Sequence, residues 1–330
     1  MPKYWQVAAG SEGRDYAKYF LKYGMAFVGG NTQEATMNNV SKGDIIILKN
    51  GLYEIKAVGE IVEREGKHKD NGDKAWLQDF DGWWLPAYCY VDWRKPEEPR
   101  KTEGLTRATI QEVHQEKHKQ IADEIIKLPI IKHDIEPPET HKVEDDKILQ
   151  FLVNEGLRVS LAEELTNTFA RIRLLADYYY KQDWSDIREH ETRTFLVIPL
   201  LLALGWAEQQ IKIEYPNKYG KIDVTCFSRA YRRKDEECIL IIETKGFSSG
   251  LDYAPEQAHR YAEVFPSCKV VLVSNGYCYK TYVRPESGSF NTYPSAYLNL
   301  LKPKDRYPLD PKNVGGALDV LKLLLPTNLR

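Results

Sequence analysis

A single apolar run, residues 238–245, sets strong limits on the fold. It reads Cys-Ile-Leu-Ile-Ile-Glu-Thr-Lys, with the length and β-branched content of a buried central strand. Successive side chains of a strand point to opposite faces, so Glu243 and Lys245 are expected on one face, about 7 Å apart. Burying a carboxylate and an ammonium costs free energy unless they pair, bind a metal or reach water. The run therefore predicts a sheet with a polar site at its end.

A neighbouring strand is predicted at residues 222–227, after the turn-like residues 217–220, with Asp223 near its start. One Asp and one Glu are hard oxygen ligands of the kind that Mg²⁺ takes together with several waters. Lys245 would then orient an attacking water and offset phosphate charge. The alternative is an internal Glu–Lys ion pair without chemistry, because short motifs match by chance.

The ordered set of residues resembles the restriction-endonuclease-like nuclease superfamily, whose motif is an Asp followed by Glu-x-Lys. It resembles more closely the nuclease domain at the N-terminus of type I restriction enzyme R subunits. That domain has a helix with a Glu and an Arg, matched here by Glu191 and Arg193, that leads to Pro-Leu-Leu and Gly-Trp, matched by residues 199–206. It also has a Gln-x-x-x-Tyr helix after the Glu-x-Lys strand, matched by Gln257 and Tyr261.

This resemblance implies a restriction-endonuclease-like α/β/α nuclease core that uses Mg²⁺ or Mn²⁺. The metal ligands it implies are Asp223, Glu243 and Glu191. The catalytic residues it implies are Asp223, Glu243, Lys245, Glu191 and Gln257. The contacts to the DNA backbone that it implies are Lys221, Arg193 and Tyr261. Glu189 remains an alternative to Glu191 as the acid of the helix.

The first part of the chain, residues 1–95, alternates short apolar strands with one helix that ends at Gly24. A hairpin is predicted across Asn50-Gly51, a strong turn signal. A capping box at residues 109–112 predicts a helix that runs to about residue 127. Together these elements predict an α+β unit, a small and strongly curved β-barrel with helices on its flank.

This order resembles the EVE and wider PUA-like group, which includes the DNA-reading domains of modification-dependent restriction systems. The matching features are Tyr4-Trp5, Gly43-Asp44-Ile, residues 57–61 and the aromatic residues 83–93. Such domains flip a modified base into an aromatic pocket, where stacking contributes about 1–3 kcal/mol per base. The pocket residues implied are Trp5, Trp83, Trp84, Tyr88 and Trp93. The alternative is that these rings fill the barrel core.

The expected organisation is a base reader with a trailing helix (1–127), a linker (128–144) and a nuclease domain (145–330). The linker is indicated by Pro129, Pro137 and Pro138. The chain has 330 residues, enough for two hydrophobic cores. Its net charge of −2 indicates no overall positive field. The five cysteines lack Cys-x-x-Cys spacing, which predicts reduced core thiols. No long apolar span or signal peptide is evident, so a cytoplasmic protein without membrane contact is expected.

Taken together, these features predict a modification-dependent DNA endonuclease of a restriction system that defends against phage. Its first domain would read a flipped modified base in double-stranded DNA, and its second would hydrolyse phosphodiester bonds with Mg²⁺. One site cuts one strand, so a homodimer is expected for double-strand cleavage. The alternatives are a structure-specific repair nuclease with a docking domain and a non-catalytic reader of modified DNA or RNA. The sequence does not identify the modification.

Overall fold

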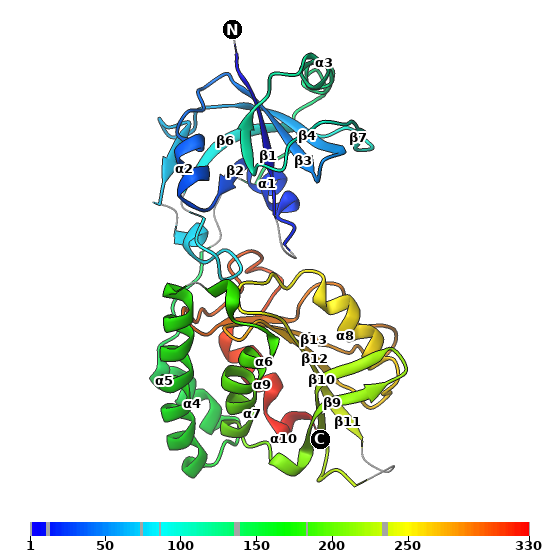
Figure 1. Cartoon of the computed structure of the whole chain (residues 1–330). Coiled ribbons are helices and arrows are strands. Elements are labelled where there is room, and N and C mark those ends of the chain that lie inside the picture. Colours follow the sequence, from blue (N-terminus) through cyan, green and yellow to red (C-terminus); the bar gives the residue numbers. More distant parts are fainter. Residues whose placement is uncertain are drawn as a thin grey trace. The chain divides into compact units, whose positions relative to one another are not determined.

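The computed structural model describes residues 2–10, 14–72, 75–85, 87–134, 139–182, 184–232 and 237–329. The chain divides into two compact units, Met1–Pro138 and Glu139–Arg330. Each unit has its own β-sheet and its own helices, so the fold is mixed α and β (Figure 1). The identities and the bounds that the sequence analysis gives to the parts of the chain stay predictions.

The first unit is built on a curled, half-barrel sheet. Its strands are β1 (Tyr4–Ala8), β2 (Met25–Val28), β3 (Ile45–Asn50), β4 (Glu54–Ile61), β5 (Lys69–Asn71), β6 (Ala87–Arg94), β7 (Arg100–Lys101) and β8 (Ile110–Glu112). They run in the order β2-β6-β4-β3-β1-β8, with β5 beside β6 and β7 beside β4. The predicted hairpin is β3–β4, and Gly51 in its turn has a φ of 59°, which glycine adopts without penalty.

The helices of the first unit are α1 (Ala17–Tyr23), α2 (Asn31–Met37), η1 (Ala75–Asp79) and α3 (Glu116–Ile125). As predicted, α1 ends at Gly24, which is left-handed. The start of the helix predicted from the capping box at residues 109–112 is wrong. Ile110–Glu112 is strand β8, which pairs antiparallel with β1, and α3 begins only at Glu116. Pairing gives the edge of β1 a backbone partner, and this tertiary contact outweighs the local helix signal.

Most described residues of the expected linker belong to one unit or the other. The backbone N–H of Ile131 donates to Trp93 O at 2.9 Å, and the His133 ring contacts Leu21 O at 2.8 Å within the first unit. Within the second unit, the N–H of Val143 donates to Pro303 O at 2.9 Å. Pro137 and Pro138, on which the linker prediction partly rests, lie outside the described residues.

The second unit has a six-stranded sheet in the order β14-β13-β12-β11-β10-β9. Its strands are β9 (Ile211–Asn217), β10 (Gly220–Phe227), β11 (Cys238–Thr244), β12 (Val270–Ser274), β13 (Cys278–Val283) and β14 (Ala296–Asn299). Strands β11 and β12 are parallel and the other neighbours are antiparallel. Every residue of β11 is buried, which confirms the predicted central strand.

The helical elements of the second unit are α4 (Asp145–Asn154), α5 (Val159–Lys181), η2 (Trp184–Asp186), α6 (Glu189–Thr192), η3 (Arg193–Val197), α7 (Ile198–Ala203), η4 (Glu208–Gln210), α8 (Ala254–Ala262), α9 (Ala317–Leu324) and α10 (Pro326–Leu329). Helices α4, α5, α7 and α9 form one packed group, and α8 packs on β11 and β12 (Figure 1). The five cysteines are free and buried, as predicted. Within the described ranges, no helix is long and apolar enough to cross a membrane.

Candidate active site

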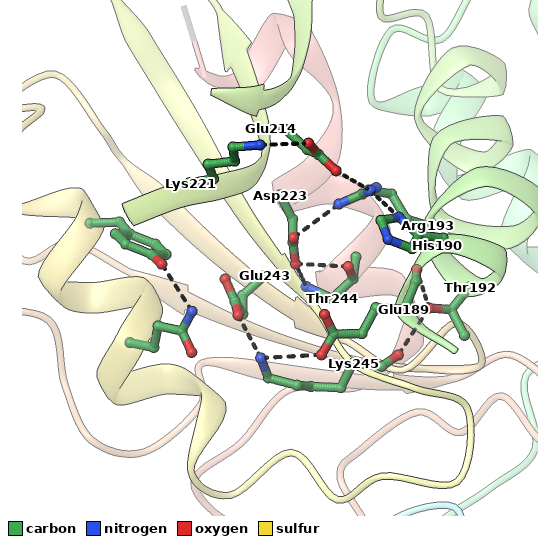
Figure 2. A network of polar contacts seen from close by, with 12 residues as sticks. Glu189, His190, Thr192, Arg193, Glu214, Lys221, Asp223, Glu243, Thr244 and Lys245 are labelled. Carbon is green, nitrogen blue, oxygen red and sulfur yellow. Dashed lines mark hydrogen bonds and ion pairs between the residues drawn. The ribbon is translucent and has the colours of Figure 1, made fainter. Parts of the chain in front are cut away.

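The antiparallel register of β10 and β11 brings two carboxylates together. Val224 pairs with Ile242, so the next residues outward, Asp223 and Glu243, lie opposite one another. Because side chains opposite each other in a sheet share a face, both carboxylates point to the same side at the end of β11. Figure 2 shows them in one polar network with Thr244 and Lys245. The sequence-predicted trio of Asp223, Glu243 and Lys245 is therefore assembled at one place.

Asp223 is held by three donors. Its Oδ2 accepts the backbone N–H of Thr244 at 2.7 Å and the Thr244 hydroxyl at 2.8 Å. Its Oδ1 accepts from Nη1 of Arg193 at 3.0 Å. Charged and backbone donors of this kind fix the orientation of a carboxylate.

Glu243 and Lys245 form a close ion pair, with 2.5 Å between Nζ and Oε1. Lys245 follows the last residue of β11, and its N–H donates to Ser274 O at 2.8 Å, which fixes its backbone. The Glu243 side chain is only 3% exposed. Its second oxygen, Oε2, is buried and has no hydrogen-bond partner among the described residues. A buried carboxylate oxygen without a donor is costly, so this atom needs an explanation.

The electrostatics of the pair follow from burial and from Asp223. Burial, together with the negative charge of Asp223, raises the pKa of Glu243 to about 7, although Lys245 opposes the shift. Burial alone would lower the pKa of Lys245, but its hydrogen bond to Glu243 and the charges of Glu243, Glu189 and Asp223 raise it overall. The ammonium therefore stays charged at neutral pH. The Glu243 carboxyl gains or loses its proton close to neutral pH.

The acid that the helix supplies to this cluster is Glu189. Its Oε1 lies 3.7 Å from Nζ of Lys245, and Figure 2 shows it beside that ammonium. Glu191 instead accepts the N–H of Arg188 at 3.1 Å through Oε2, as the third residue of a capping box. The structure thus does not bring Glu191, the predicted metal ligand, into the cluster. The alternative that the sequence left open, Glu189, occupies that place.

A wide turn in the helix sets the position of Arg193. Arg193–Val197 (η3) is π-helical, and the N–H of Ile198 donates to Arg193 O, five residues back. Pro199 has no N–H and its ring clashes with the carbonyl four residues earlier in a regular helix. A π turn enlarges that spacing and accommodates the proline. The π turn also leaves Arg193 buried, with its side chain directed at Asp223.

In this structure Arg193 is engaged with neighbouring side chains, so its predicted contact with the DNA backbone would require it to leave these partners. Its side chain is 6% exposed, and besides Asp223 it contacts Glu214 Oε1 at 3.2 Å and His190 Nδ1 at 2.7 Å. Lys221, also predicted to contact DNA, is 70% exposed and pairs with Glu214 Oε2 at 3.3 Å. Glu214 is a site residue that the sequence analysis missed. A period-two pattern leading into the turn at residues 217–220 marks β9, and this pattern would have placed Glu214 opposite Asp223.

Gln257 and Tyr261 pair with each other on α8. Gln257 Nε2 donates to the Tyr261 hydroxyl at 3.0 Å, and Asn217 Nδ2 donates to Tyr261 O at 3.4 Å. Tyr261 is buried, and a Cβ at Gly220 would lie 3.4 Å from its hydroxyl oxygen. The pair therefore fastens the β9–β10 turn to α8. These bonds do not bring Gln257 or Tyr261 into contact with the carboxylate cluster. The predicted roles of Tyr261 at the DNA backbone and of Gln257 in catalysis therefore stay predictions.

Asp223 and Glu243 fit a hard divalent cation. No group of three or more His, Cys, Asp or Glu in the described part of the chain is arranged to hold a metal. Mg²⁺, however, commonly takes one or two protein carboxylates and completes its shell with water or phosphate. A cation between these carboxylates would satisfy Glu243 Oε2 and offset both its burial and the repulsion from Asp223, which together raise the pKa of Glu243.

The five aromatic residues predicted to line a base pocket separate into two groups. Trp5, Tyr88 and Trp93 are core residues, and the indole N–H groups donate to Asp44 Oδ2 at 2.9 Å and to Met25 O at 3.2 Å. For these three the alternative, that the rings fill the core, describes the structure. Trp84 is 56% exposed, and Trp83 is half-buried with the Arg14 guanidinium 3.6 Å from its ring centroid.

Comparison with known proteins gives no assignment for either unit. No protein-family model matches the chain, and a search of curated proteins finds no match. Its groups determine what the arrangement can do chemically: two adjacent carboxylates, a charged lysine and a third acid, Glu189, beside that lysine. Such a set can hold a hard cation and neutralise a polyanion beside it.

Proposed function

We propose that the protein is a Mg²⁺- or Mn²⁺-dependent endonuclease that cuts double-stranded DNA carrying a modified base. The observation that supports the proposed hydrolysis of DNA is the state of the Glu243 side chain. It is a buried carboxylate with one unsatisfied oxygen, beside Asp223 and bonded to a lysine. An ion pair with a purely structural role is expected to satisfy its buried oxygens, whereas a ligand carboxylate needs one oxygen for the cation.

In this proposal each residue has a distinct task. Asp223 and Glu243 hold the cation, which when bound supplies Lewis-acid polarisation of the phosphodiester. Lys245 has three donors, so it can keep its bond to Glu243 and donate another to a phosphate oxygen or an attacking water. Glu189, 3.7 Å from Nζ, restrains the ammonium from its other side.

The fold assignments in the proposal are a PUA-like first unit and a restriction-endonuclease-like α/β/α second unit. The curled sheet of the first unit and the central position of β11 in the second are compatible with them. The rings that would recognise the modified base are then those outside the core, Trp84 and Trp83. Exposed or half-buried rings can stack on a base, whereas rings bonded within the core cannot move to meet one.

A second candidate is a nuclease whose first unit docks on DNA or a partner without reading a modification. The observation that favours it is the burial of Trp5, Tyr88 and Trp93, which leaves fewer rings for a base pocket. The assembled Asp223, Glu243 and Lys245 favour both nuclease candidates over a reader without catalysis.

Digestion of matched duplexes tests the proposal. The duplexes share one sequence and carry either no modification or one of 5-methylcytosine, 5-hydroxymethylcytosine, glucosylated hydroxymethylcytosine and N6-methyladenine. With Mg²⁺ the full-length protein should cut at least one modified duplex and spare the unmodified one. Equal cutting of all duplexes would favour the docking candidate. A double-strand break, as opposed to a nick, would support the proposed homodimer.

A further inference from the structure

The Arg193 guanidinium occupies an enclosed position between two carboxylates. It donates through Nη1 to Asp223 Oδ1 at 3.0 Å, and Nη2 lies 3.2 Å from Glu214 Oε1. Nη2 also lies 2.7 Å from His190 Nδ1, and the side chain is almost wholly buried (Figure 2). A guanidinium that bridges two carboxylates acts as the resident cation of that position.

The backbone of β9 is distorted at the residue that supplies the second carboxylate. The register pairs Tyr215 with Ile222 and Ile213 with Val224, so Glu214 falls opposite Asp223. Glu214 has a φ of 51°, a left-handed conformation that is strained for a residue with a side chain. Like charges opposite each other in a sheet are unfavourable. A cation between the two carboxylates, here the Arg193 guanidinium, offsets this repulsion.

Asp223 is therefore the expected partner of two cations, the Arg193 guanidinium and the proposed metal ion. In the described structure Arg193 holds its Oδ1, while the proposed metal site needs the same carboxylate together with Glu243. Two other cations near the cluster have partners of their own. Lys245 is bonded to Glu243, and Lys221 contacts Oε2 of Glu214 from an exposed position. Arg193 is therefore the group whose position decides how much negative charge Asp223 and Glu214 offer to a metal.

We propose that Arg193 and a divalent cation compete for Asp223 and Glu214, and that a DNA phosphate draws Arg193 away and so promotes metal binding. Glu214 then becomes a further carboxylate available to the cation. The inference rests on the proposed nuclease function, because it requires a metal at Asp223. It makes metal and DNA binding cooperative, and such coupling is reciprocal. A guanidinium suits the exchange because its planar fork matches phosphate oxygens as well as carboxylate oxygens.

The first test measures Mn²⁺ binding to the full-length protein by titration calorimetry without DNA. Arg193→Gln should bind Mn²⁺ at least about tenfold more tightly than the wild type, within the usual range of coupling between sites. Lys221→Gln, which removes a charge from the exposed side of Glu214, is the matched control and should change the affinity less than about twofold. Adding Glu214→Gln to Arg193→Gln should weaken Mn²⁺ binding again.

Arg193→Gln leaves two carboxylates without their partner, so its folding must be checked by thermal unfolding. Arg193→Lys keeps a charge but cannot bridge both carboxylates, and it should give a smaller gain in Mn²⁺ affinity. A folded Arg193→Gln or Arg193→Lys protein that binds Mn²⁺ no more tightly than the wild type would overturn the competition.

The second test adds a short duplex in a Lys245→Met background, which prevents cutting during the titration. The duplex should tighten Mn²⁺ binding at least about fivefold with Arg193 present, and not after Arg193→Gln. Asp223→Asn separates the two proposals. If it leaves Mn²⁺ binding unchanged, the proposed metal site itself fails, and the competition fails with it. If it abolishes binding while Arg193→Gln has no effect, the metal site stands and only the competition is overturned.

Discussion

Two buried clusters, the aromatic core of the first unit and the charged cluster at the end of β11 in the second, differ in how their burial is compensated. The first unit buries aromatic rings, such as Trp5 and Trp93, whose polar N–H groups are bonded inside the fold. The second buries charge at the end of β11, including Glu243 and the guanidinium of Arg193. A buried ring is favourable by itself, whereas a buried charge is unfavourable unless something compensates it. Burial of a ring therefore says little about function, while burial of an unsatisfied carboxylate points to a ligand.

The largest expected effect comes from removing the charge beside that carboxylate. Lys245→Met should lower the rate of DNA cleavage by about 10²–10³-fold, because a donor to developing phosphate charge is lost. Lys221→Met removes an exposed lysine that is predicted to contact the DNA backbone, so at saturating duplex it is the comparison, with less than about a threefold effect on the cleavage rate. The rates are measured on one modified duplex with Mg²⁺. Equal losses in the two variants would mean that only the overall charge near the cluster matters.

In the first unit the contrast is between a core ring and an exposed ring. Trp5→Ala should lower the free energy of unfolding by about 3–5 kcal/mol, because it opens a cavity and leaves Asp44 without the indole donor. Trp84→Ala should change it by less than about 0.5 kcal/mol. Denaturant unfolding measures both.

The same two variants address base reading. Trp84→Ala should reduce the preference for a modified duplex if this ring stacks on the base, since stacking contributes about 1–3 kcal/mol. An unchanged preference in folded Trp84→Ala protein would remove the exposed ring from the reader and strengthen the docking alternative.

The raised pKa of Glu243 predicts a pH effect in metal-free buffer. The folded protein holds a proton on Glu243 up to a pKa of about 7, whereas the unfolded chain releases it near 4.5. The folded state thus binds more protons between these values, and its stability falls as pH rises from 4.5 to 7. The total is about 3 kcal/mol, at about 1.4 kcal/mol per pKa unit.

Glu243→Gln removes this titration and serves as the comparison. The difference in unfolding free energy between Glu243→Gln and the wild type should therefore grow by about 3 kcal/mol from pH 4.5 to pH 8. A difference that stays constant with pH would show that Glu243 titrates normally and that burial and Asp223 do not raise its pKa.

The smallest expected effects separate the two glutamates of α6. Glu191→Ala should lower the free energy of unfolding by about 0.5–1 kcal/mol through loss of the capping box, with cleavage little changed. Glu189→Gln should lower the cleavage rate with little change in stability, because it contacts Lys245 at the surface of the cluster. The reverse pattern would restore Glu191 as the acid of the site.

How much of the structure could be predicted from the sequence depended on the kind of sequence pattern. The β11 strand, the Asn50-Gly51 hairpin and the convergence of Asp223 with Glu243 follow from alternation, turn chemistry and strand register, all of which are local. The choice between Glu189 and Glu191 was not accessible, because a π turn after α6 changes the helical phase of the side chains. The π turn depends both on Pro199 and on the packing around it, so sequence spacing alone does not reveal it.

The failures in the first unit have a different origin. The predicted helix begins too early because Ile110–Glu112 form strand β8, for which the edge of β1, about a hundred residues earlier in the sequence, provides a backbone partner. The aromatic residues carried no signal that separates a core ring from a pocket ring, since both fit an apolar strand. Only tertiary contacts, such as Trp5 to Asp44, make that distinction.

The most direct test of the central claim is the Mg²⁺ dependence of DNA cleavage by the wild type and by Glu243→Gln. Glutamine has nearly the same shape as glutamate, so the variant should fold and still bind the duplex, while losing a ligand that a hard cation requires. We predict cutting of a modified duplex by the wild type with Mg²⁺, none in EDTA, and none by Glu243→Gln at any Mg²⁺ concentration. Cutting by Glu243→Gln at the wild-type rate would contradict the assignment of this cluster as the active site.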